Sequence, residues 1–280
     1  MELECPMSLL ERETRLRSGR VPQGIGGEVG PTNGWQITPD AFLLRAENGL
    51  AFHYSRGEGV VFERGEGTSE ATVSLYFNGS VHGAIAWMNG FVPLHASAIC
   101  HNHKVYAFTG DSGAGKSTLV AGLAGQEMPL FADDVLIMDI RDPEQIRCLP
   151  GHKSLKLWSD AAMLVGIERR EQVFPDMDKY YVEPLPQGPD EILPLALLCY
   201  LERDGRPYLS KMTASERFSC LSTALYRPEF TAGAGIGNVE LFRIRKILAK
   251  SIPMSRFLRP FEESLYFEGL EFIAEFIRGS

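Results

Sequence analysis

Residues 110–118 read GDSGAGKST, which is a complete G-x-x-x-x-G-K-[ST] motif. The apolar residues 104–109 before it are typical of a buried strand, and residues 117–124 after it are typical of the beginning of a helix. A strand, a glycine-rich loop and a helix in this order form a phosphate-binding loop. The motif therefore predicts an α/β fold built around a loop that binds the phosphates of a nucleotide.

The residue types in this loop suit an anion. The glycines allow backbone conformations that turn several N–H groups toward a phosphate, and the following helix adds the positive end of its dipole. We expect Lys116 to reach the β- and γ-phosphates of ATP and the Ser117 hydroxyl to be a ligand of Mg²⁺. The alternative is a glycine-rich turn without a ligand. The expected nucleotide-binding residues are Gly110, Asp111, Ser112, Gly113, Ala114, Gly115, Lys116, Ser117 and Thr118.

The composition excludes several other classes of protein. With 280 residues the chain can form one large domain or two small ones, and its net charge of −8 argues against nucleic acid as a partner. We see no apolar run long enough to span a membrane, and the acidic residues at the N-terminus do not suit a signal peptide. The five cysteines are scattered without C-x-x-C spacing, which favours free thiols in the cytoplasm.

The chain divides by composition into three segments. Residues 1–34 are expected to hold a charged helix over 8–20 and a linker over 21–34, which is rich in glycine and proline. Residues 35–91 are expected to form a small β-rich unit, and residues 92–280 a catalytic domain that ends in helices. The strands expected in the β-rich unit are 35–37, 41–45, 50–54, 59–63 and 71–77, followed by a helix over 81–88.

The third segment mixes strand patterns with helix patterns. Residues 93–100 and 104–109 are expected to form a strand pair. Apolar residues at three- and four-residue spacing predict the later helices. The remaining strands are expected at 129–140, 193–201 and 208–212, and the helices at 215–226, 238–250 and 261–277.

Two adjacent carboxylates interrupt the apolar stretch after the loop helix. Asp133 and Asp134 follow Phe131-Ala132 and precede four apolar residues. Charges at such a position are costly unless a cation uses them, and a magnesium–phosphate pocket would supply one. One carboxylate would then hold the metal and the other would accept a proton from an attacking hydroxyl. The alternative is a turn between two strands.

A histidine lies on the strand that precedes the loop strand. His95 stands 21 residues before Lys116, and Asp133 and Asp134 stand 17 and 18 residues after it. A single histidine on a strand is more often a hydrogen-bonded core residue than a catalyst. The number of residues that separate His95 from the loop and from the two carboxylates makes a functional role more plausible here.

Together His95, the GDSGAGKS loop and the FADD sequence resemble the catalytic core of the HPr serine kinase/phosphorylase family, over residues 92–140. The resemblance implies a P-loop kinase core of the HPr kinase type. It also implies that Lys116 and Ser117 bind phosphate and magnesium, that Asp133 assists the metal and that Asp134 is the general base toward a serine hydroxyl. His95 would orient the carboxylates.

The sequence departs from this family in one feature. It has no match to the L-E-V-R-G signature, which supplies an arginine near the phosphate, so neither the phosphorylase activity nor HPr as substrate is expected. Another cation is then needed. Lys156 and Lys179 are favoured among the candidates, which are Lys153, Lys156, Arg169, Arg170, Lys179 and Arg227.

A second resemblance covers most of the chain but has less specific motifs. The LHASA sequence at 94–98, LKLWSD at 155–160 and LYRP at 225–228 resemble the HPr-kinase-like proteins of lasso-peptide biosynthesis. That resemblance implies ATP- and Mg²⁺-dependent phosphorylation of the C-terminal serine of a precursor peptide.

Three functions are weighed on these grounds. The first is a kinase for a serine hydroxyl of a peptide or protein. The second is a kinase for a small-molecule alcohol. The third is a nucleotide-sensing ATPase without a phosphoryl acceptor. The sequence contains neither an N-K-x-D motif nor an L-S-G-G-Q motif, so it gives this function little support. The sequence is compatible with a homo-oligomer. The three tryptophans, Trp35, Trp87 and Trp158, are expected to pack in the hydrophobic core.

Overall fold

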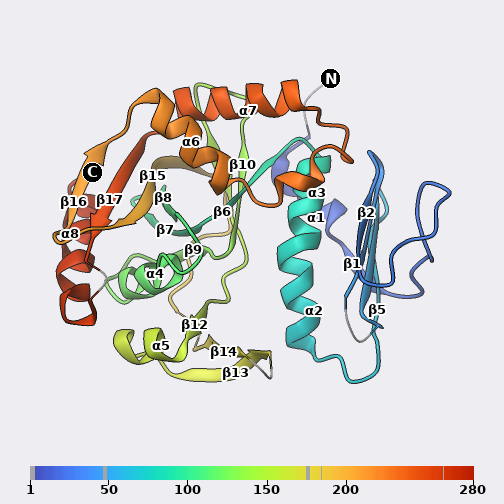
Figure 1. Cartoon of the computed structure of the whole chain (residues 1–280), viewed down its shortest axis with the longest axis horizontal. Coiled ribbons are helices and arrows are strands. Elements are labelled where there is room, and N and C mark those ends of the chain that lie inside the picture. The colour runs from blue at the N-terminus through green and yellow to red at the C-terminus, as the bar shows by residue number, and fades with distance from the viewer. Residues whose placement is uncertain (1–3, 47–48, 175–176, 184, 261) are drawn as a thin grey trace. The chain divides into compact units, whose positions relative to one another are not determined.

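The computed structural model describes residues 4–280 except 47–48, 175–176, 184 and 261. It forms two compact units, each of which is described by itself (Figure 1). The first consists of Met1–Pro93 and Tyr226–Arg243, and the second of Leu94–Leu225 and Ile244–Ser280. The expected catalytic segment, 92–280, differs from the second unit because residues 226–243 cluster with the N-terminal residues.

The first unit contains a five-stranded sheet and helices. Strand β1 is parallel to β5, and the other neighbours are antiparallel. The strands in spatial order are β1 (Leu16–Ser18), β5 (Gly59–Glu63), β4 (Ala51–Ser55), β3 (Ala41–Arg45) and β2 (Gly34–Ile37). The helices are α1 (Pro6–Glu13), α2 (Glu70–Tyr76), a π-helical segment (Phe77–Val81), α3 (His82–Met88) and a 3₁₀ turn (Pro228–Phe230).

Two expectations for this unit are wrong. The strand expected over 71–77 is helical, because the side chain of Ser69 caps α2 by accepting the N–H of Thr72, and apolar residues recur at helical spacing from Val73 to Val81. The β-branched residues suggested a strand, but burial of one helix face decided the conformation. The helix expected over 8–20 ends at Glu13, because residues 16–18 pair with β5.

A buried carboxylate joins α1 to this sheet. The side chain of Glu13 is 1% exposed and accepts hydrogen bonds from the Tyr54 hydroxyl (2.7 Å) and the Gly57 N–H (2.7 Å). Arg12 pairs with its second oxygen at 2.8 Å. Burial raises the pKa of Glu13, but these hydrogen bonds outweigh burial and hold the pKa below its ordinary value.

We expect Glu13→Gln to lower the free energy of unfolding by about 2 kcal/mol at neutral pH, because buried donors lose a charged acceptor. The carboxylate pKa is lower in the folded state. Its stabilisation is therefore present above the unfolded value of 4.5 and is lost as the pH falls toward the folded value. Urea unfolding at pH 7 and pH 4 measures this. An equal difference between variant and native protein at both pH values would contradict the role of the charge.

The second unit is built on a large mixed sheet. Strand β15 lies parallel to both β8 and β17 (Figure 1). The pairs β10–β11, β11–β15, β7–β8, β7–β9 and β16–β17 are antiparallel. The order is β6 (Val92–His95), β10 (Val135–Asp139), β11 (Arg147–Leu149), β15 (Leu193–Arg203), β8 (Lys104–Thr109), β7 (Ser97–His101) and β9 (Leu130–Ala132), with β17 (Met254–Arg259) also on β15 and β16 (Tyr208–Lys211) on β17.

A smaller sheet and several helices complete this unit. The small sheet has the order β12 (Lys156–Trp158), β14 (Met177–Val182) and β13 (Arg169–Phe174). The helices are α4 (Lys116–Ala124), α5 (Ser159–Val165), α6 (Ala214–Ala224), α8 (Tyr266–Arg278) and a 3₁₀ turn (Glu263–Leu265), and α7 (Asn238–Ser251) extends from residues of the first unit. None of the described helices is both long enough and apolar enough to span a bilayer.

The strand expectations for this unit need three corrections. The strand expected over 93–100 breaks at Ala96, so His95 ends β6 and Ser97 begins β7. The strand expected over 129–140 breaks at Asp133-Asp134. Residues 208–212 do not pair with β15, because β17 lies between them. The expected start of the last helix, residue 261, lies outside the described residues.

The core of this unit holds the loop helix in place. Leu119 and Leu123 of α4 are fully buried, as are Ile273 of α8 and Phe108 of β8. Residues 119–124 of α4 are apolar and none of them is exposed, which is typical of a helix enclosed by its neighbours. The loop that precedes α4 is therefore fixed at both ends.

Candidate functional site

The expected phosphate loop lies between β8 and α4. Its three glycines have positive φ values, 143° at Gly110, 79° at Gly113 and 78° at Gly115, which disfavour other residues. A Cβ atom at Gly110 would also lie 3.1 Å from the carbonyl oxygen of Leu201. The glycines are thus needed for the shape of this loop, and the strand–loop–helix prediction is confirmed.

Lys116 folds back over the loop. Its Nζ donates to the carbonyl oxygens of Gly110 (3.0 Å) and Asp111 (3.1 Å), and the residue is 7% exposed. Burial lowers the pKa of Lys116, while the charges of Asp134 and Asp133 oppose that shift. The ammonium group is therefore held where a phosphate on the loop would meet it.

One carboxylate oxygen of Asp133 accepts hydrogen bonds from two serine hydroxyl groups. Its Oδ1 accepts hydrogen bonds from Ser97 Oγ (2.7 Å) and Ser117 Oγ (3.0 Å). The backbone N–H of Asp133 donates to the carbonyl oxygen of His152 (3.0 Å), which fixes the turn. The sequence did not single out Ser97, although it lies two residues after His95 in the LHASA sequence.

Asp134 adopts a left-handed backbone conformation (φ 71°) between β9 and β10. Its backbone oxygen lies 3.2 Å and its Oδ1 3.3 Å from His95 Nδ1, and its Oδ2 lies 3.6 Å from Lys156 Nζ. Both groups facing Nδ1 are acceptors, so this nitrogen carries a hydrogen. His95 therefore orients the carboxylate.

Three neighbours keep Asp134 ionised. Burial raises its pKa, but the hydrogen bond from His95 and the charges of Lys156 and Lys179 outweigh burial and hold the pKa well below its ordinary value. Asp134 is therefore a carboxylate at neutral pH.

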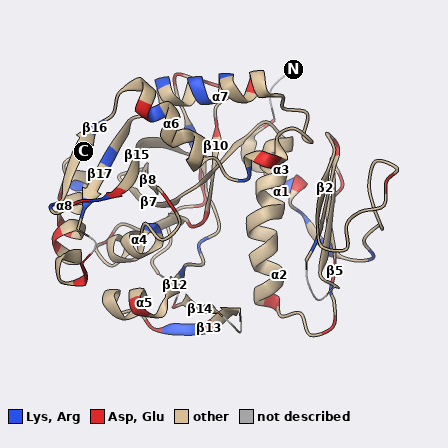
Figure 2. Cartoon of the chain, viewed as in Figure 1, with Lys and Arg blue, Asp and Glu red and all other residues tan. Residues whose placement is uncertain are grey.

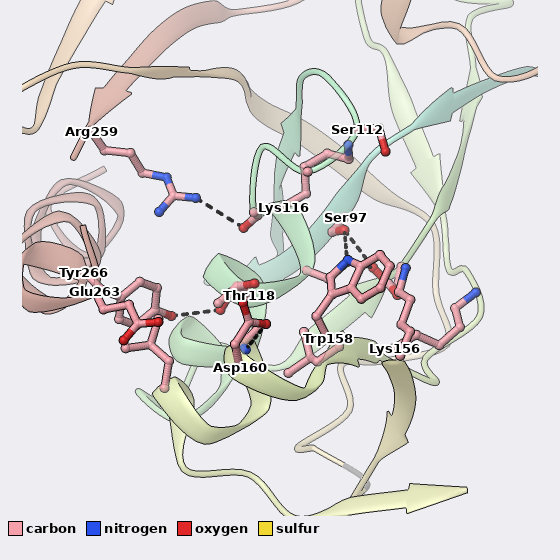
Figure 3. Close-up of a pocket in the computed structure, with 18 of the residues that line it drawn as sticks. Ser97, Ser112, Lys116, Thr118, Lys156, Trp158, Asp160, Arg259, Glu263 and Tyr266 are labelled. Carbon is pink, nitrogen blue, oxygen red and sulfur yellow. Dashed lines mark hydrogen bonds between the residues drawn. The ribbon is translucent and has the colours of Figure 1, made fainter. Parts of the chain in front are cut away.

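These side chains line one cavity of about 350 Å³ (Figure 3). His95, Ser97, Asp133, Asp134 and Lys156 line one part of it with the loop residues. The rest has apolar walls, which come from β12, from α5, from residue 260 and from the first residue of α8. Those wall residues are Leu157, Trp158, Ala161, Leu164, Pro260 and Tyr266, accompanied by the carboxylates of Asp160, Glu262 and Glu263.

The structure thus brings the sequence-selected residues together, although they come from separate strands and turns. His95, Lys116, Ser117, Asp133 and Asp134 all line this cavity. The other loop residues that line it are Ser112, Gly113, Gly115 and Thr118. Those that do not are Gly110, Asp111 and Ala114, which build the turn behind it.

The tryptophan expectations are only partly correct. Trp87 is buried and donates its indole N–H to the carbonyl oxygen of Tyr226 (2.8 Å). Trp35 is 37% exposed, and Trp158 is 48% exposed and lines the cavity. Trp158 directly precedes α5 at the end of a short strand, which places its ring at the edge of the cavity rather than in the core.

Arg259 is a cavity residue that the sequence analysis missed, because strand β17 was not expected. The residue is 5% exposed, and its Nη2 donates to the carbonyl oxygens of Ala114 (2.8 Å) and Gly115 (3.4 Å) (Figure 3). Burial lowers the pKa of Arg259. The end of β17 is thereby tied to the phosphate loop.

We expect Arg259→Met to weaken ATP and ADP binding equally, by about threefold to tenfold, because the loop loses a charge-assisted hydrogen bond that preorganises it. Titration calorimetry with both nucleotides measures this. A variant that binds both as tightly as the native protein would show that Arg259 does not shape the loop.

The oxygen atoms around Asp133 suit Mg²⁺. Ser117 Oγ and Asp133 Oδ1 converge within 3.0 Å, and this hard cation prefers hydroxyl, carboxylate, phosphate and water oxygens. No group of three or more His, Cys, Asp or Glu side chains in the described part of the chain forms a ready metal site.

The described residues form a mixed α/β protein with a glycine-rich loop at a cavity that has both polar and apolar walls. No family model matches this chain, and no curated protein matches it. Among solved structures it is similar to the Hpr(Ser) kinase/phosphatase from Coxiella burnetii, with 13% identity, 67% of this chain and 88% of that chain covered, and a TM-score of 0.34. Because the identity and the TM-score are this low, the comparison carries no functional argument, and a function can be inferred only from the residues of the site.

Proposed function

We propose that this protein is a kinase that transfers the γ-phosphoryl group of ATP to a serine hydroxyl with the help of Mg²⁺. One observation carries the proposal: the phosphate loop with Lys116 and the ionised, oriented carboxylate of Asp134 line the same cavity. A nucleotide site alone needs no such carboxylate. A phosphoryl transferase uses one to accept the proton of the attacking hydroxyl.

Each residue has a role in this proposal. The loop N–H groups and Lys116 bind the phosphates, and Ser117 and Asp133 hold Mg²⁺. When bound, Mg²⁺ neutralises phosphate charge. Asp134 accepts the hydroxyl proton, and His95 keeps the carboxylate in place. Ser97 does the same for Asp133. Catalysis then consists mostly of positioning and charge neutralisation.

The acceptor proposed first is the C-terminal serine of a lasso-peptide precursor. Its support is the sequence resemblance at 94–98, 155–160 and 225–228. The cavity is also open to a second substrate beside Asp134, whose side chain is 34% exposed. A peptide end can enter such a site more easily than an internal segment of a folded protein.

The direct experiment incubates the protein with ATP, Mg²⁺ and peptides that end in serine, and measures peptide mass. We expect one added phosphoryl group on the terminal serine, and no addition to matched peptides that end in alanine. Phosphate release without a modified peptide would favour the ATPase without an acceptor. Transfer to a free alcohol but to no peptide would favour the small-molecule kinase.

A further inference from the structure

The basic side chains that line the cavity differ in how far other groups of the protein already engage them. Four basic residues line its described part: Lys116, Lys156, Lys179 and Arg259. Lys116 donates to two loop carbonyl groups, Arg259 donates to the loop, and Lys156 pairs with Asp134. Three of the four are therefore already engaged by acceptors of the protein.

Lys179 differs from the other three. Within the described part of the chain its ammonium forms no ion pair or hydrogen bond, and its contact is with the face of the Trp158 ring, 5.9 Å from Nζ to the ring centre. Such a contact is weak at an exposed site and leaves the three N–H donors of the ammonium without acceptors. Lys179 is thus a cation of the cavity with no direct ion-pair partner among the described residues.

The position of Lys179 follows from the small sheet. Residues Trp158 of β12 and Lys179 of β14 are direct antiparallel partners, so both side chains stand on the same face. Figure 2 shows basic residues on this sheet. The Trp158 ring therefore lies beside the Lys179 ammonium, and both residues line the cavity.

Lys179 also lies close enough to Lys116 and to Asp134 for its charge to act on both. Its positive charge lowers the pKa of Lys116 and that of Asp134. Lys116 marks the phosphate loop and Asp134 marks the acceptor side. A cation near both Lys116 and Asp134 can stabilise the negative charge of a phosphoryl group that passes from the nucleotide to the acceptor.

We propose that Lys179 is a catalytic residue that binds the transferred γ-phosphoryl group of the nucleoside triphosphate, while Lys156 positions Asp134. The inference rests on the proposed kinase function. In the step, the acceptor oxygen forms a bond to the γ-phosphorus and the bond to the β–γ bridging oxygen breaks. That oxygen keeps the electron pair as part of the diphosphate, and the hydroxyl proton goes to Asp134. Lys179 donates to the γ-oxygens throughout.

The test compares ATP with ADP, because Lys179 would touch a group that ADP lacks. With Mg²⁺ present, we expect Lys179→Gln to weaken ATP binding about tenfold by calorimetry and to leave ADP binding within about twofold. Lys179→Arg should keep part of the preference for ATP. The matched control is Lys211→Gln, an exposed lysine at the end of β16 that does not line the cavity.

A second measurement follows Trp158 itself. ATP should draw the ammonium off the indole ring and change tryptophan fluorescence, ADP should not, and Trp158→Phe should remove the response. Equal effects of Lys179→Gln on ATP and ADP, or no effect on either, would overturn the role of Lys179 while leaving the kinase intact. A native protein that binds no ATP would overturn both proposals.

Discussion

Asp134→Asn is expected to lower phosphoryl transfer by roughly 100- to 10,000-fold, the range in which a general base contributes. The amide keeps the size of the side chain and still accepts a hydrogen bond from His95. It loses the charge that His95 and Lys156 face, and it cannot take the proton of the attacking hydroxyl. The rate of phosphorylation of a serine-ending peptide, followed by mass, measures this.

Nucleotide binding separates this role from a structural one. The variant should bind Mg²⁺-ATP within about threefold of the native protein, because the loop and Lys116 provide most of the phosphate contacts. The control is Asp142→Asn, an exposed residue whose side chain accepts the N–H of Glu144 and can do so as an amide. A variant at position 134 that phosphorylates at the native rate would refute the base assignment.

Lys116→Ala is expected to weaken ATP binding by about 10- to 100-fold, because charge-assisted hydrogen bonds to phosphate are among the strong ones. The native ammonium is buried against the loop carbonyl groups and is therefore positioned before the nucleotide binds. Calorimetry with ATP measures the loss. Phosphoryl transfer should fall at least as much.

The unfolding of this variant must be checked as well. Burial already disfavours the charged form of Lys116, so its removal should not lower the thermal midpoint of the protein by much. The exposed Lys211→Ala serves as the matched control. An unchanged ATP affinity with an intact fold would mean that the glycine-rich loop does not bind nucleotide in the way proposed.

The local patterns of the sequence predicted the loop region well. Strand β8, the glycine-rich loop and α4 lie where the motif placed them, because glycine spacing and an uninterrupted apolar strand are properties of neighbouring residues. Local patterns were less informative at 71–77. There the residues suit a strand or a helix, and the cap at Ser69 and burial of Val73 decided for the helix.

The arrangement of the strands required the whole chain. Strand β17 separates residues 208–211 from β15, and the pairing of strands distant in sequence cannot be read from either segment alone. The same strand delivers Arg259 to the loop. The short strands β12 and β14 likewise bring Trp158 and Lys179 together through cross-strand pairing.

The sequence by itself determined the local features on which the proposed chemistry depends. They are a glycine-rich loop, a lysine and a serine at its end, a pair of carboxylates, and a histidine at a set spacing along the chain. These features are local, since residue type and spacing carry them. Only the tertiary structure decided which oxygen of Asp133 accepts the hydrogen bonds of Ser97 and Ser117, and which groups keep Asp134 ionised. It also decided which lysine of the cavity has no ion-pair partner among the described residues. Those are properties of distance and burial, and they arise only when separate strands and turns meet at one cavity.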